Sequence, residues 1–221
     1  MSLTLETDGA VRLDRAALSI LGELQKIADA QAADRAGMRL RGIPQLSRLL
    51  APTGGLGTLA AARLGEATRP VRAILFNKSE GNNWALGWHQ DRIIVVRERI
   101  ETAGFGPWTI KSGMVHVAPP ADLLGGMLTM RVHLDSVPET NAPLQIARGS
   151  HRLGRIAERD VDTVVARCGT AACLAEAGDV WLYATPILHA SAASSAPRRR
   201  RVLQVDFAAV DLPDGLQWLG I

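Results

Sequence analysis

From Val71 onward the chain is a series of short apolar or alternating runs, separated by turns rich in Gly and Pro. Such runs are typical of β-strands, and many short strands with turn residues between them favour a β-barrel or a double-sheet jelly roll. The runs that we predict as strands are residues 71–78, 93–96, 127–134, 144–147, 180–183 and 202–210. The sequence therefore predicts a mainly β fold with flanking helices.

The first 70 residues have a different pattern. Apolar residues recur at helical spacing over residues 13–34, which predicts an amphipathic helix, and an Ala-rich helix is expected at residues 58–64. A chain of 221 residues fits one domain. We therefore expect a single domain over residues 1–221, with a helical N-terminal section at 1–70 and a jelly-roll core at 71–210.

Composition argues against a membrane or secreted protein. No stretch approaches the roughly 20 apolar residues that a membrane span needs, and the early residues are acidic and polar, unlike a signal peptide. The two cysteines, Cys168 and Cys173, are expected as reduced thiols. The sequence thus predicts a cytoplasmic protein with no membrane partner.

Four consecutive arginines, Arg198 to Arg201, raise the hypothesis of a nucleic-acid binder. The net charge is only +3, no aromatic residues interleave with the run, and a strand-like segment follows it. We therefore expect no nucleic-acid partner, although salt-dependent DNA binding that is lost on changing Arg198 and Arg199 would favour that function.

The stretch Trp84 to Asp91 places a histidine and a carboxylate two residues apart. On a β-strand, His89 and Asp91 would point to the same face. They would supply two of the three ligands of a 2-His-1-carboxylate triad, which binds non-haem Fe(II). A His-x-Asp pair alone is a weak signal, because it often arises by chance, so the hypothesis needs a third ligand from elsewhere in the chain.

His189 is the best candidate for that ligand, since it follows a strand and Pro186. Ser191, two residues later, would share its face. Arg200 lies eleven residues after His189, and a hairpin would bring it back beside the histidine. A guanidinium there could hold a carboxylate in a bidentate clamp.

These motifs resemble the phytanoyl-CoA dioxygenase family of Fe(II)- and 2-oxoglutarate-dependent oxygenases. The resemblance spans roughly residues 71–207. It rests on WHQD at 88–91, MRVHLD at 130–135, NAPLQIARGSHRLGRI at 141–156, AGDVWLYATPILHAS at 177–191, and Arg200. It implies a double-stranded β-helix, the cupin-like jelly roll. It also implies an enzyme that uses Fe(II), 2-oxoglutarate and O2 to hydroxylate a small organic substrate, with release of succinate and CO2.

The resemblance also assigns roles to residues. His89, Asp91 and His189 match the catalytic iron ligands, Arg200 the residue that binds the distal carboxylate of 2-oxoglutarate, and Ser191 its hydroxyl partner. The choice among the four arginines rests on the eleven-residue offset from His189, so a neighbouring arginine, one position away, is the alternative. Asp91 is intact, whereas halogenases of the family have a small residue there, so the resemblance favours hydroxylation.

Other assignments follow from position and strand parity. Asn77, Trp84 and Thr129 are expected to line the co-substrate pocket. The Gly- and Pro-rich residues 101–122 are expected to form a long irregular insertion, and whether it acts as a lid is open. His133 and His151 are interpreted as structural rather than as metal ligands.

The alternative to an oxygenase is a non-catalytic metal-binding module on the same jelly roll, because a fold does not fix a function. The expected partner is a small-molecule substrate. Neither its identity nor the oligomeric state follows from the sequence.

Overall fold

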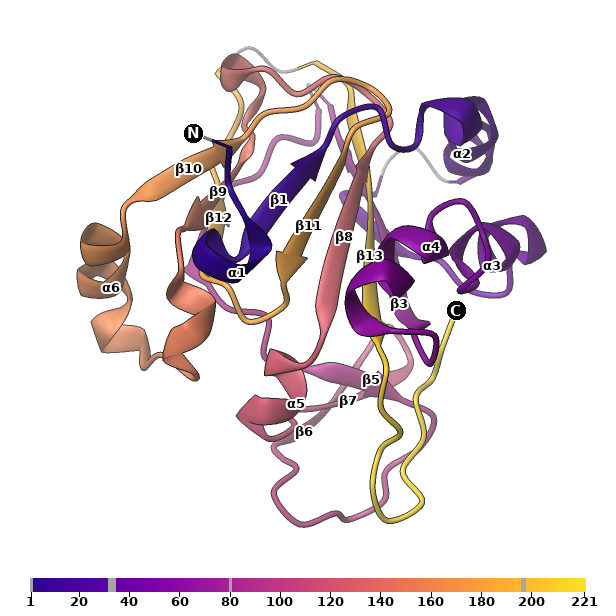
Figure 1. Ribbon diagram of the computed structural model, residues 1–221, viewed down its shortest axis with the longest axis vertical. Helices are drawn as coiled ribbons and strands as arrows, with labels where there is room; N and C mark the ends of the chain where they lie inside the picture. Colours follow the sequence, from indigo (N-terminus) through magenta and orange to yellow (C-terminus); the bar gives the residue numbers. More distant parts are fainter. Residues whose placement is uncertain (1, 32–34, 80, 196–197) are drawn as a thin grey trace.

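The computed structural model describes residues 2–31, 35–79, 81–195 and 198–221, and its framework is a pair of large antiparallel sheets (Figure 1). The first has six strands in the order β1-β11-β8-β13-β3-β2. Their bounds are Ala10–Leu13, Val180–Ala184, Leu128–His133, Arg200–Ala208, Arg69–Lys78 and Gly37–Arg39.

The second large sheet has four strands in the order β10-β9-β12-β4. Their bounds are Thr170–Cys173, Leu144–Ala147, His189–Ser191 and Leu86–His89. Side chains from both sheets line one internal cavity, as expected for a jelly roll. The prediction of a mainly β, double-stranded β-helix is confirmed.

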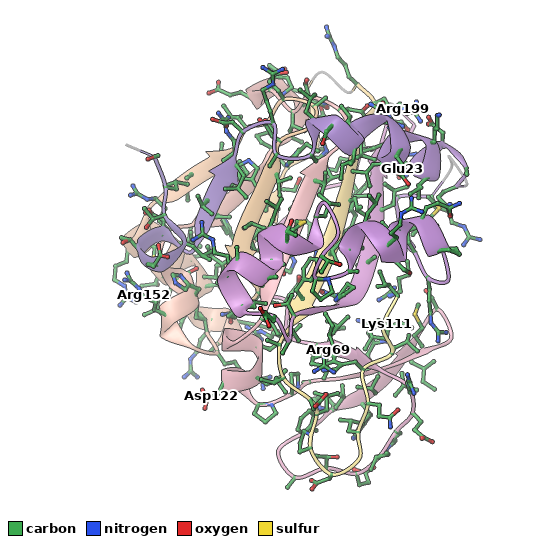
Figure 2. The ribbon with its side chains drawn as sticks, turned by 45° about the vertical axis from the view of Figure 1, so that its right-hand side comes forward. Glu23, Arg69, Lys111, Asp122, Arg152 and Arg199 are labelled. Carbon is green, nitrogen blue, oxygen red and sulfur yellow. The ribbon has the colours of Figure 1, made fainter. Side chains whose placement is uncertain are left out.

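Strand alternation divides the residues of the six-stranded sheet between two environments. On one face, Leu75, Met130 and Leu203 belong to a core that includes apolar side chains of the N-terminal helices. The helices are α2 (Leu21–Asp29), α3 (Pro44–Leu50) and α4 (Gly57–Leu64). Figure 2 shows them across the outer face of this sheet. The other face therefore points into the barrel, and it carries most of the buried polar side chains of this sheet.

The N-terminal section differs from the prediction in a way that matters for the sheet. In place of one helix over residues 13–34, the chain forms β1, a 3-10 turn at Leu18–Ile20 and α2; residues 32–34 lie outside the described residues. Arg15 adopts a positive φ of 56°, and the Ala17 N–H donates to the Gly178 carbonyl. The helix in this range therefore begins only at Leu21, after a turn that is held by the hydrogen bond to Gly178. β1 and β2 form the two edges of the six-stranded sheet.

The insertion at residues 101–122, expected to be irregular, contains a regular hairpin. β6 (Trp108–Lys111) and β7 (Met114–Val117) form a hairpin, and β5 (Ile94–Val96) completes a three-stranded sheet. Ser112 and Gly113 both have positive φ, 53° and 73°, as a two-residue hairpin turn requires. The many Gly and Pro residues of this segment suggested an irregular loop, so the hairpin was not predicted. α5 (Ala121–Gly125) follows.

The remaining elements are short. They are α1 (Leu5–Asp8), α6 (Val161–Cys168) and 3-10 turns at Glu139–Asn141, Ser150–Leu153 and Glu158–Asp160. None of the helices in the described part of the chain has the length and apolar character needed to cross a bilayer.

Candidate metal and co-substrate site

Two adjacent strands bring the predicted metal ligands together. His89 ends β4, His189 begins β12, and the two residues are direct antiparallel partners. Their ring centroids are 4.3 Å apart. Asp91 lies two residues beyond His89, and possible ligand atoms of the three side chains all lie within 4.8 Å of one another. The geometry therefore fits one shared metal ion.

Both imidazoles are held with one nitrogen free. The Nδ1 of His89 donates to the Gly87 carbonyl at 2.8 Å, and that of His189 donates to the Ile187 carbonyl at 3.0 Å. Because a carbonyl can only accept, each Nδ1 carries the proton and each Nε2 keeps its lone pair for a metal. Burial lowers the pKa of His189 to about 4, so this ring is neutral at pH 7.

Arg72 keeps the Asp91 carboxylate ionised. Burial opposes ionisation of Asp91, but the charge of Arg72, with His189 and His89, outweighs it and lowers the pKa. The Arg72 Nη2 lies 3.4 Å from Asp91, and its Nε donates a short hydrogen bond to Asp206. Two imidazoles and one carboxylate, with room for further ligands, are the donor set that suits non-haem Fe(II).

A cavity of about 120 Å³ opens beside the triad, between the two sheets. Its wall includes the predicted co-substrate residues Trp84, Ser191 and Arg200. The β3 residues that line it are Arg72, Ile74, Phe76 and Lys78, one face of the strand. The cavity thus runs from the candidate metal ligands toward the start of β13.

Two predicted lining residues lie elsewhere. Asn77 alternates with Phe76 and Lys78, so it faces the helix-covered side of β3 and is absent from the cavity wall. Thr129 points into the barrel but also lies outside this wall. Its hydroxyl donates to Asp206 at 3.0 Å and lies 3.0 Å from the Thr185 hydroxyl. Thr129 therefore supports the carboxylate that binds Arg72.

Strand alternation decides which arginine of the run 198–201 faces the cavity. Arg200 is 3% exposed and lines the cavity, whereas Arg201 faces outward and binds Asp135 and Asp29. Arg198 and Arg199 are exposed before the strand begins. The Arg200 Nη1 donates to the Ala142 carbonyl, and burial beside Arg131 lowers its pKa to about 9. This guanidinium is still charged at neutral pH.

Four polar lining residues were missed from the sequence: Arg72, Lys78, Arg131 and Gln204. The Lys78 Nζ donates to the Trp84 carbonyl at 2.6 Å, the Ala192 carbonyl at 2.9 Å and the Ser191 hydroxyl at 3.3 Å. Lys78 therefore holds Trp84 and Ser191 at the cavity. Lys78 lies directly opposite Arg200 in the pairing of β3 with β13, and this could have been found only by predicting the register of these strands.

The pH dependence of stability tests this environment of Lys78. Burial, with Arg200 and Arg131 nearby, lowers the Lys78 pKa from 10.5 to about 8. Between these values the unfolded chain holds the proton and the folded chain does not, so raising the pH favours folding. From pH 8 to 10, the free energy of unfolding of the wild type should therefore rise relative to that of Lys78→Met. Urea unfolding at several pH values, with a chelator present, measures the difference.

Lys26→Met, at an exposed lysine of α2, is the matched control and should follow the wild-type profile. Parallel profiles for wild type and Lys78→Met would contradict a depressed Lys78 pKa.

A second cavity, of about 440 Å³, lies on another side of the triad. Asp91 lines both cavities, so the second one also reaches the candidate metal site. Its wall comes from the segment after β4, the 3-10 turn at Ser150–Leu153 and its continuation, and the region of α5. It includes Arg92, Asp122, His151 and Arg155.

The other histidines lie outside the triad. The His116 Nε2 lies 2.8 Å from the Arg39 Nη2, and its Nδ1 donates to the Met114 carbonyl. His133 is 2% exposed inside the barrel, and burial lowers its pKa to about 3. Neither ring belongs to the group of candidate metal ligands.

Comparisons with known proteins agree with this architecture. EctD from S. alaskensis, in its apo form, matches with a TM-score of 0.68 and 20% identity, over 92% of this chain and 74% of that chain. HygX from Streptomyces hygroscopicus, with nickel and 2-oxoglutarate bound, matches with a TM-score of 0.61 and 13% identity, over 94% of this chain and 87% of that chain. No curated protein matches by sequence. At these identities, the structural likeness establishes the fold.

The family assignment rests on a separate comparison. The sequence profile of the family Phytanoyl-CoA dioxygenase (PhyH) matches residues 56–202, which is more than half of the chain and contains every candidate ligand. The chain belongs to the phytanoyl-CoA dioxygenase family of Fe(II)- and 2-oxoglutarate-dependent oxygenases.

Proposed function

We propose that this dioxygenase hydroxylates a small organic substrate at a site where His89, Asp91 and His189 hold Fe(II). Arg200 binds the distal carboxylate of 2-oxoglutarate, and Ser191 and Trp84 form the wall beside it. The observation that carries the proposal is the triad within 4.8 Å, joined by one cavity to a buried arginine.

The chemistry that iron and 2-oxoglutarate supply together, once bound, is O2 activation coupled to oxidative decarboxylation, which yields succinate, CO2 and a hydroxylated product. The chain's own residues prepare the site for it. The carbonyls of Gly87 and Ile187 fix the two imidazoles, Arg72 keeps Asp91 charged, and Lys78 orders Ser191 and Trp84. Since Asp91 fills the carboxylate position, hydroxylation is favoured over halogenation.

The second cavity is the proposed substrate site. It shares Asp91 with the first cavity, and at about 440 Å³ it has the size of a typical small-molecule pocket. Related structures have been determined with small molecules, EctD with 5-hydroxyectoine and HygX with hygromycin B. A small-molecule substrate is therefore the expected partner of this chain.

Two alternatives predict different behaviour. A non-catalytic metal-binding module would bind Fe(II) without releasing succinate. A nucleic-acid binder would need a free arginine patch, but Arg199 and Arg201 form ion pairs with Asp29, and Arg200 points into the barrel. These contacts support the expectation of no nucleic-acid partner.

We also propose that residues 1–221 act as a single oxygenase domain, since strands from the N-terminal section form both edges of the main sheet. The cytoplasmic location stays a prediction from the sequence.

The proposed function is tested first by anaerobic binding. Fe(II) plus 2-oxoglutarate should give the wild type a weak visible charge-transfer band, which Arg200→Gln should weaken without loss of iron. A succinate-release screen over classes of small molecules, with isotopically labelled O2, should then identify a substrate whose product carries the label. Absence of the band in pure protein would overturn the assignment, and a chlorinated product would overturn hydroxylation.

A further inference from the structure

Arg131 is a buried arginine that forms no ion pair with any described carboxylate, although its charge contributes to the lowered pKa of Asp91. It lies on β8, is 6% exposed and lines the cavity beside the triad. Its Nη1 donates to the Gln204 side-chain oxygen at 2.8 Å, and its Nε has no hydrogen-bond partner among the described residues. A buried charge without a counter-charge is costly, so an arginine kept in this state points to an anion that arrives later.

Arg200 shares these features. It is 3% exposed, and its Nε also lacks a partner within the described residues. Neither guanidinium forms an ion pair with a described carboxylate, whereas Arg72 in the same cavity pairs with Asp206 and Asp91. Arg131 lies close enough to Arg200 to lower its pKa. Within the described part of the chain, the cavity therefore holds two guanidinium groups that form no ion pair.

The strand register places Arg131 between the metal ligands and Arg200. Arg131 is opposite Gln204 on β13, and the next inward-facing pair is Thr129 with Asp206, the acid that binds Arg72 beside Asp91. Arg200 lies four residues from Gln204 in the other direction, opposite Lys78. The Arg131 guanidinium is 5.4 Å from the Phe76 ring centre, a cation–π contact that, with Gln204, fixes its orientation.

We propose that Arg131 is a second co-substrate-binding residue, which pairs with the carboxylate of the keto-acid end of 2-oxoglutarate while Arg200 pairs with the distal carboxylate. One guanidinium then meets each charge of the dianion. The assignment rests on the proposed function, and it adds a charged group beside the metal-proximal end, where the predicted site had only the iron ligands.

The test compares two co-substrates in two variants. 2-Oxopentanoate has the chain length and keto-acid end of 2-oxoglutarate but lacks the distal carboxylate. Arg131→Gln should weaken binding of both compounds by a similar factor of roughly 10 to 100, the usual effect of losing a charged hydrogen-bond partner. Arg200→Gln should weaken 2-oxoglutarate alone. Anaerobic calorimetry with Fe(II) or Co(II) measures these affinities without catalysis.

Further variants separate binding from folding. Arg131→Lys keeps the charge but loses the planar fork, so it should restore part of the affinity. Arg69→Gln, at an exposed arginine labelled in Figure 2, should match the wild type. In metal-free protein, Arg131→Gln should not lower Tm, because it removes an unpaired buried charge, but the rise in Tm on adding Co(II) and 2-oxoglutarate should shrink.

Each outcome bears on a separate claim. Unchanged affinity in Arg131→Gln would overturn the inference and leave the oxygenase intact. Loss restricted to 2-oxoglutarate, as in Arg200→Gln, would assign Arg131 to the distal carboxylate and overturn the pairing proposed above. Failure of the wild type to bind either compound with metal would overturn the proposed function instead.

Discussion

Replacing His189 with alanine is expected to abolish metal binding. The side chain is buried, its ring is neutral at pH 7, and its hydrogen bond to Ile187 leaves Nε2 for the metal. Loss of a residue that only supports a ligand costs roughly 10- to 100-fold in metal affinity, so loss of one of three ligands should cost more. Anaerobic titration with Fe(II) or Co(II) measures the effect, and circular dichroism checks the fold.

His116→Gln is the matched control, because His116 is also buried but contacts Arg39 rather than the triad. It should bind metal as the wild type does. If His189→Ala kept wild-type affinity while His116→Gln lost it, the metal site would have been assigned to the wrong histidine.

The candidate metal site could be predicted because two of its three ligands are close together in the sequence. His89 and Asp91 share a face through a two-residue spacing that needs no knowledge of the fold. His189 is a hundred residues away; its position after a strand made it the best candidate, and the resemblance to a known family strengthened its link to the pair. The direct pairing of His189 with His89 depends on the order β9-β12-β4, which the sequence does not reveal without a fold.

To predict the other side chains inside the barrel, both the parity and the register of the strands would have to be known. Asn77 was placed in the pocket although its neighbour Lys78 lines it, and a shift of one residue exchanges the two faces of a strand. Arg200 and Arg201 differ in the same way. Arg131 was taken as part of a motif with no role of its own, since its lack of a carboxylate partner is a property of packing.

The two edge strands of the six-stranded sheet were also missed from the sequence. β1 and β2 contain four and three residues, too few to show a strand period, and a helical pattern follows β1 almost at once. Their formation depends on hydrogen bonds offered by β11 and β3, which lie far along the chain. Local periodicity therefore predicted a helix that began too early, at residue 13, and did not reveal either edge strand, because both strands depend on long-range pairing.

Replacing Arg72 with leucine should destabilise the metal-free protein by about 3–5 kcal/mol. The change leaves the Asp206 carboxyl buried at 2% exposure without its cation, and leaves Asp91 without the charge that lowers its pKa. For a domain of this size, that corresponds to a fall in Tm of roughly 6–20 °C. Thermal and urea unfolding in the presence of a chelator would measure it.

Arg69→Leu is the control: Arg69 lies three positions before Arg72 on β3, and the change removes an exposed ion pair with Asp211, which should cost at most about 1 kcal/mol. In Arg72→Leu, adding Asp206→Asn should recover part of the loss, because the double variant no longer buries an unpaired charge.

The pH dependence of the stability of Arg72→Leu provides an independent test of this explanation. Burial already raises the Asp206 pKa, and removing Arg72 should raise it further, because Arg72 is the charge that opposes this shift. The folded variant then takes up a proton that the unfolded chain binds only at lower pH, so its stability should increase as the pH falls from 8 toward 5. The destabilisation relative to wild type should shrink over that range. A deficit that stayed constant with pH would mean that lost packing, rather than the unpaired carboxylate, causes the loss of stability.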